Sequence, residues 1–210
     1  MATKGRSPGR PRADADPATR ARALHAAQVH FGERGYAGVS MDQLAAAAGV
    51  NVRAIYHYYP SKRALFDAAA AAAFDTFGTL VLELVFRHDD TRSRLHGFVD
   101  LYRLLHRDHR HLLALLSVVS MEAIAEARTT EGPSSTVIGA EPVMALNQLI
   151  VEAAQERGEL DPSVGTDAAV ALIQAIGVGL GVADLADGGP FLGMLDALDH
   201  LIDGTLVRDR

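Results

Sequence analysis

Cysteine and tryptophan are both absent from this chain of 210 residues, and aromatic side chains make up only 6% of it. Because there is no cysteine, the protein has no disulfide framework and no thiolate for catalysis or metal binding. The first residues are basic and include no long apolar run, so we expect no secretory signal peptide. These absences fit a protein of the reducing cytoplasm.

Motifs of enzyme chemistry are also missing. We find no nucleophile elbow, no phosphate-cradling glycine loop and no paired carboxylates in an acid–base context. Residues 177–181 superficially resemble a dinucleotide fingerprint, but no strand pattern precedes them and no helix begins after them. His106 and His109 share a helix face, which would permit a metal, yet the surrounding run is rich in Arg and is better interpreted as a solvated polar patch. We therefore expect no enzymatic activity, no cofactor and no metal.

The formal net charge of −6 alone argues against nucleic acid, but the charge is distributed unevenly. Residues 1–63 contain ten Lys and Arg against four Asp and Glu, whereas residues 64–210 contain ten against twenty-two. A basic amino-terminal quarter followed by an acidic remainder is typical of a DNA-binding module joined to a body that does not bind DNA.

Residues 40–62 have the pattern of two short helices joined by a tight turn. Ser40 and Gln43 form a capping box at the start of the first helix. Gly49 can adopt the left-handed conformation that ends this helix, and Asn51 is a favourable N-cap for the next one. This arrangement is typical of the helix-turn-helix, whose second helix enters the major groove of DNA.

Side chains suited to DNA lie on and around the second helix. Its first turn would meet base edges, its polar-tipped residues would reach base or phosphate, and the lysine that opens the following helix would favour phosphate. An ordinary helical hairpin, with its tyrosines packed in a core, would give the same spacing. The candidate DNA contacts here are Ser40, Val52, Arg53, Ala54, Tyr56, His57 and Lys62.

Several runs in this region carry a family resemblance. They are Phe31-Gly32-Glu33-Arg34-Gly35-Tyr36, Val39-Ser40-Met41, Ala48-Gly49-Val50-Asn51 and Ile55-Tyr56-His57-Tyr58-Tyr59-Pro60-Ser61-Lys62-Arg63-Ala64-Leu65-Phe66. Together, over roughly residues 17–66, they resemble the signature of the TetR family of one-component transcriptional regulators. Asn51 stands where the family usually has Ser or Thr, and Tyr59 where it usually has Phe; both replacements keep the physical role, a cap and an aromatic plug.

The resemblance implies an all-α protein with a helix-turn-helix DNA-binding domain and a helical-bundle domain for ligand binding and dimerisation. We place the first at residues 16–63 and the second at residues 64–210. Residues 1–15, rich in Gly, Pro and Arg, are expected to form a disordered basic arm. Within it, Gly9-Arg10-Pro11-Arg12 resembles the core of an AT-hook, so Arg10 and Arg12 are candidates for the minor groove. The alternative is a solvated tail that adds only non-specific affinity.

Apolar residues at helical spacing predict further helices after residue 60. The first of them starts in the DNA-binding module and ends in the body, so we expect it to act as a mechanical link. Pro142 should kink its helix or mark the true start of that helix. The uncharged stretch 168–183 is sixteen residues long and contains Gln174, which is too short for a bilayer and indicates a buried helix rather than a membrane span. The predicted helices are 61–86, 93–107, 110–128, 137–157, 166–185 and 190–207.

Three glycines, Gly177, Gly179 and Gly181, lie in the first of the last two predicted helices. Small residues allow a neighbouring helix to approach closely. In the TetR family the last two helices pack against their copies as a four-helix bundle, so the resemblance implies a homodimer formed through them. Packing within one subunit is the alternative, since glycine spacing does not identify the neighbour.

These observations predict a sequence-specific DNA-binding regulator, a repressor released from a palindromic double-stranded DNA operator by a small-molecule effector. The inward positions of the body suit an uncharged, largely apolar effector. The alternative is a helical small-molecule-binding or catalytic protein whose helix-turn-helix is purely structural. The candidate effector-binding residues are Phe77, Phe98, Tyr102, His106, Leu116, Met121, Met144 and Asn147.

Overall fold

The computed structural model describes residues 17–127, 141–186 and 189–204, and within these ranges it contains helices and no strand. The predicted all-α fold class is confirmed. The helices are α1 (Pro17–Arg34), α2 (Met41–Ala48), α3 (Val52–Tyr58), α4 (Lys62–Leu84), α5 (Thr91–Asp108), α6 (Arg110–Ala127), α7 (Glu141–Glu156), α8 (Thr166–Leu185) and α9 (Phe191–Ile202).

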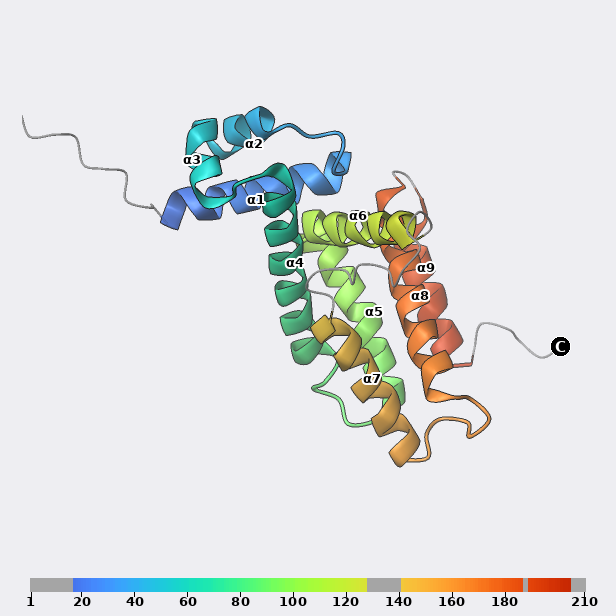
Figure 1. Ribbon diagram of the computed structural model, residues 1–210. Coiled ribbons are helices and arrows are strands. Elements are labelled where there is room, and N and C mark those ends of the chain that lie inside the picture. The colour runs from blue at the N-terminus through green and yellow to red at the C-terminus, as the bar shows by residue number, and fades with distance from the viewer. Residues whose placement is uncertain (1–16, 128–140, 187–188, 205–210) are drawn as a thin grey trace, which may run out of the picture.

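Helices α1, α2 and α3 form a small amino-terminal unit around a common core (Figure 1). Phe31, Leu44 and Ile55 contribute one fully buried side chain from each of these helices. The beginning of α4 joins the same core, because the ring of Phe66 lies edge-on to Phe31 with centroids 5.1 Å apart. The domain boundary between residues 63 and 64 stays a prediction; this contact shows that the first turns of α4 are shared between the two parts.

The body of the protein is a bundle into which α4 descends from the amino-terminal unit (Figure 1). Helix α5 packs against α4 and α9, and α7 packs against α4 and α8. Helix α6 lies across the top of this bundle, directly under α1 (Figure 1). The amino-terminal unit therefore rests on the body through two helices, α4 and α6.

The predicted helices agree with those observed to within a few residues. Pro142 is the second residue of α7, where its missing N–H costs nothing, so it marks the start of the helix rather than a kink. The predicted residues 137–140 and 205–207 lie outside the described ranges.

By length and apolar composition, α4 and α8 would each be able to cross a membrane. Helix α8 has 20 residues, which is longer than the uncharged stretch from which we argued, so its length does not exclude a span. Its packing argues instead for a place in the bundle. Asp184 is 3% exposed and pairs with His106 of α5, and Gln174 faces a cavity inside the body.

Candidate nucleic-acid interface and effector cavity

The helix-turn-helix has the caps that the sequence predicts. The Ser40 hydroxyl accepts a hydrogen bond from the Gln43 backbone N–H at 3.2 Å, and the Gln43 side chain accepts one from the Ser40 N–H at 2.8 Å. Gly49 adopts φ 64°, which ends α2 and turns the chain. The Asn51 side chain then accepts from the Ala54 N–H at 2.8 Å and starts α3. The Ser40 hydroxyl thus accepts in the cap and still has its own proton to donate.

Helix α3 presents one polar, exposed face. Ile55 is fully buried and anchors the helix on the amino-terminal core. Arg53, Tyr56 and His57 are exposed, with Tyr56 48% accessible, whereas Val52 and Ala54 are half-buried. An arginine, a tyrosine and a histidine on one anchored short helix can donate hydrogen bonds to phosphates and base edges.

Lys62 lies beside this face but has a partner within the protein. Its ammonium nitrogen is 4.3 Å from the centre of the Tyr36 ring, a cation–π contact. The contact holds the amino end of α4 near the turn after α1. Arg10 and Arg12 lie outside the described residues.

A cavity of about 350 Å³ lies in the body among α4, α5, α6, α7 and α8. Its size suits a small organic ligand. Six of the eight residues predicted to bind an effector line it: Phe77, Phe98, Tyr102, Leu116, Met144 and Asn147.

Two predicted residues, His106 and Met121, are not part of the cavity wall. The His106 Nδ1 atom contacts a carboxylate oxygen of Asp184, and the imidazole stacks on Phe191 with centroids 4.9 Å apart. Met121 is 41% exposed on the outer side of α6. Helical spacing predicted that both side chains face the interior of the body. His106 pairs instead with Asp184 of α8, and Met121 lies on the exposed side of α6.

Several cavity residues were missed by the sequence prediction. The walls also contain Phe74 of α4, two serines of α6, and Gln174 with two glycines of α8. The serines offered a signal, because they recur three residues apart on the inner face of an apolar helix. The full additional set is Phe74, Leu113, Ser117, Ser120, Ala123, Ile124, Val143, Ile173, Gln174, Gly177, Val178 and Gly181.

None of the residues that line this cavity in the described ranges carries a formal charge. Tyr102 is buried in the cavity wall, and its hydroxyl donates a hydrogen bond to the Gly177 carbonyl at 3.0 Å. Burial raises the pKa of Tyr102 well above its ordinary value, so the phenol is neutral at physiological pH. The cavity is therefore apolar with a few neutral polar groups.

Helix α6 connects this cavity to the DNA-binding unit. One side of α6 lines the cavity through Leu116 and Ser117, and another side touches α1. The His25 ring of α1 meets the His111 ring of α6 edge-on, with centroids 5.4 Å apart. Burial, followed by the nearby His25 and His109, lowers the pKa of His111. An uncharged His111 at neutral pH suits this packed junction.

The polar run at 106–111 is divided among different partners. His106 pairs with Asp184, the Arg107 guanidinium binds Asp108 at 2.7 Å, and His111 packs against His25. Among the described residues no group of three or more His, Asp or Glu side chains is placed to hold a metal ion.

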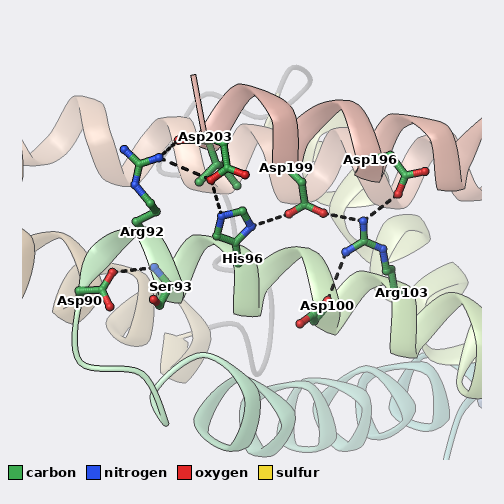
Figure 2. A network of polar contacts seen from close by, with 10 residues as sticks. Asp90, Arg92, Ser93, His96, Asp100, Arg103, Asp196, Asp199 and Asp203 are labelled. Carbon is green, nitrogen blue, oxygen red and sulfur yellow. Dashed lines mark hydrogen bonds and ion pairs between the residues drawn. The ribbon is translucent and has the colours of Figure 1, made fainter. Parts of the chain in front are cut away.

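A ladder of ion pairs fastens α9 to α5 (Figure 2). The Arg103 guanidinium binds Asp199 at 2.6 Å and Asp196 at 2.9 Å. His96 lies between Asp199, at 2.7 Å, and Asp203, at 3.0 Å. The hydrogen bond to Asp199, aided by Asp203, raises the pKa of His96. The carboxylates recur along α9 at helical spacing, so one face of α9 packs against α5 through these ion pairs.

Large apolar side chains are exposed on α8 and α9. Leu172 is 61% exposed on α8, and Leu201 is 58% exposed on α9. Gly179 has open space where a side chain would start, whereas Gly177 and Gly181 face Tyr102 and Ser117 of the same chain. Contacts within one subunit thus explain why Gly177 and Gly181 lack a side chain, but they do not explain why Gly179 does. The remaining exposed apolar side chains of these helices are Val182, Leu192 and Met194.

Comparison with known proteins assigns the amino-terminal unit. Residues 23–69 match the family model for bacterial regulatory proteins of the tetR family. The HTH-type transcriptional repressor SCO4008 of Streptomyces coelicolor is 35% identical over 108 residues, which are 51% of this chain and 53% of that protein. The match thus spans about half the length of each chain.

Solved structures share the whole fold at low identity. A transcriptional regulator from Saccharomonospora viridis in complex with choline has a TM-score of 0.71 and 19% identity over 92% of this chain and 100% of that one. FadR from Bacillus subtilis in complex with stearoyl-CoA has a TM-score of 0.70 and 16% identity over 90% and 100%. Fold, helix-turn-helix and family match agree. Residues 23–69 are thus similar to the tetR family of bacterial regulatory proteins, and the chain shares the fold of these solved structures.

Proposed function

We propose that the protein is a sequence-specific DNA-binding regulator that represses transcription until a small molecule releases it from its operator. The observation that carries this proposal is the exposed Arg53, Tyr56 and His57 face of α3, anchored from behind by the buried Ile55. The basic amino-terminal part of the chain adds the favourable charge. The partial relative from Streptomyces coelicolor is itself named a transcriptional repressor.

A homodimer would present two copies of α3 to the two half-sites of a palindromic operator. The exposed apolar side chains of α8 and α9 support this assembly, because large apolar groups left in solvent favour contact with another chain. Gly179 lies on α8 with open space around it, where a second α8 would be able to approach closely.

The effector would bind in the cavity of the body and be uncharged and largely apolar, in keeping with the lining. The effector can release the protein from DNA only if the protein has a conformation that binds the effector more tightly and the operator less tightly. Helices α4 and α6 both contact the cavity and the DNA-binding unit, so a shift of either one would change the separation of the two copies of α3. We place the protein in the cytoplasm, free of membrane.

A gel-shift titration with DNA from the promoter region of its own gene tests the DNA-binding role. Tyr56→Ala and Lys62→Ala should weaken binding by similar factors on different sequences, because phosphate contacts carry no sequence information. Arg53→Ala should change the sequence preference, with a loss of about 1–3 kcal/mol on the preferred site. Arg87→Ala removes an exposed cation just beyond the far end of α4 and serves as the control.

Unchanged operator affinity in Tyr56→Ala, Lys62→Ala and Arg53→Ala would refute the proposed face. That result would favour the alternative of a helical small-molecule-binding protein with a structural helix-turn-helix.

A further inference from the structure

The polar groups of the cavity differ in how much hydrogen-bonding capacity they have left. The Ser117 hydroxyl lies 2.8 Å from the Leu113 carbonyl, and the Ser120 hydroxyl lies 2.9 Å from the Leu116 carbonyl. The Tyr102 hydroxyl lies 3.0 Å from the Gly177 carbonyl. A carbonyl oxygen only accepts, so each of these hydroxyls donates its single proton to the backbone. All three therefore offer only oxygen lone pairs to a molecule in the cavity.

Asn147 is the opposite case. It is 8% exposed, it lines the cavity from α7, and no described residue forms a hydrogen bond with its side chain. The amide atoms are not among the fully buried unpaired polar atoms of the described residues, so they stay accessible from the cavity, and a ligand that pairs with them must match the hydrogen bonds of the water it displaces. The amide offers both N–H donors and an acceptor oxygen.

The rest of the lining restricts the charge of the ligand. Among the described residues, no lysine, arginine or histidine lines the cavity to neutralise an anion, and no aspartate or glutamate lines it to neutralise a cation. Bringing an unpaired charge into such surroundings costs several kcal/mol or more, by general estimates for buried ions. A carboxylate would also face three hydroxyl oxygens that cannot donate to it, and the amides of Asn147 and Gln174 would be its only polar side-chain donors among the described lining residues. Phe98 and Tyr102 offer π faces to a cation, but their rings already pack on each other with centroids 5.1 Å apart.

We propose that the cavity selects uncharged apolar molecules bearing a hydroxyl group, which donates to a hydroxyl oxygen of the wall and accepts from the Asn147 amide. The inference rests on the proposed function in so far as it makes the cavity the effector site. It adds the requirement that the ligand donate a hydrogen bond. An apolar body alone is not enough, and acidic or phosphorylated forms of the same molecule should be rejected.

Isothermal titration calorimetry of the full-length protein with four matched probes tests this selection. The probes are n-octanol, its isomer methyl heptyl ether, octanoate and octyltrimethylammonium. The ether keeps the atoms of octanol but cannot donate. We expect n-octanol to bind about tenfold to a hundredfold more tightly than the ether, because the analogue leaves buried polar groups unpaired. Octanoate and octyltrimethylammonium should bind more weakly still.

Two variants and one control assign the effect to named side chains. Asn147→Leu should lower the affinity for both n-octanol and the ether, because the oxygen of either probe can accept from the amide. Ser120→Ala, which changes less volume, should reduce the preference for n-octanol, because it removes an oxygen to which only the alcohol can donate, and it provides a second reading if Asn147→Leu unfolds. Gln148→Leu makes a similar amide-to-leucine change at the exposed neighbouring position of α7 and should keep both the affinity and the preference. Circular dichroism of each variant checks its fold.

Equal or tighter binding of the ether, octanoate or octyltrimethylammonium would overturn the inference, as would a folded Asn147→Leu that binds n-octanol as tightly as the parent protein does. Failure of all four probes to bind would overturn it too. Gel shifts without any probe separate this outcome from the proposed DNA-binding role. If n-octanol binds with the expected selectivity but leaves the operator complex intact, the effector role fails and the inference on selectivity stands.

Discussion

Gly32 offers the sharpest test of how the DNA-binding unit is attached to the body. It lies in α1 where that helix crosses α6, and a Cβ atom built on it would lie 3.0 Å from the Leu115 backbone nitrogen and 3.1 Å from the His111 carbonyl oxygen. Backbone atoms cannot rotate away as side chains do. Gly32→Ala must therefore push α1 and α6 apart by a few tenths of an ångström.

The expected cost follows from comparison with a second glycine. Overpacking of a filled interface costs about 1–3 kcal/mol, whereas replacing glycine by alanine inside a helix gains about 0.5–1 kcal/mol. Gly78 lies in α4 with nothing near its missing side chain, so Gly78→Ala should show the gain alone. The difference between the two variants in the free energy of unfolding isolates the packing cost, and it should be about 1–3 kcal/mol.

Urea unfolding at fixed protein concentration measures this difference, and a gel shift measures its functional consequence. Gly32→Ala should also weaken operator binding, because α1 carries α2 and α3 with it. Gly78→Ala should bind the operator normally. If Gly32→Ala were stabilised as much as Gly78→Ala, the close approach of α1 to α6 would not exist in the protein. That result would refute the proposed coupling of the cavity to the DNA-binding unit through α6.

Three further changes have defined outcomes. The Tyr59 hydroxyl is buried without a hydrogen-bond partner among the described residues, so Tyr59→Phe should raise the free energy of unfolding by about 1 kcal/mol or more, measured by urea unfolding; a loss would show that the hydroxyl is paired. Gly179→Leu should sediment as a folded monomer and lose operator binding, because nothing within the subunit opposes the new side chain; a stable dimer would place the interface elsewhere. The raised pKa of His96 means that its contribution to stability is complete below its unfolded pKa near 6.5 and is lost as pH rises through the raised value. The thermal midpoint should therefore fall across that window in the parent protein and lose this component in His96→Gln; identical profiles would contradict the ladder.

Local chemistry made the helix-turn-helix predictable from sequence. Ser40, Gln43, Gly49 and Asn51 each act on backbone groups within a few residues, so their spacing is enough to place α2 and α3. Pro142 likewise marks the start of α7 through its own missing N–H. The positions of these residues needed no knowledge of tertiary contacts.

Contacts between distant segments were not predictable in this way. His106 and Asp184 are separated by 78 residues, and nothing in the spacing of α5 indicates that a carboxylate on α8 will take the imidazole away from the cavity. The glycines of α8 make the same point. Gly177 and Gly181 are closed by Tyr102 and Ser117, and Gly179 is open, although all three look alike in the sequence.

Helix α6 contacts both the cavity and α1 because it is apolar and buried on several sides. Its residues Leu116 and Ser117 line the cavity, while the backbone nitrogen of Leu115, one position away, would lie 3.0 Å from a Cβ atom built on Gly32 of α1. Adjacent residues of a helix point about 100° apart, so a rotation or shift that relieves pressure on the cavity side changes the α1 side at once. The hydroxyls of Ser117 and Ser120 are bonded to the backbone of α6 itself, so a ligand that pairs with them would contact the same helix that supports α1. The proposed linkage between effector and operator requires such a helix, whose position depends on both the cavity and the amino-terminal unit.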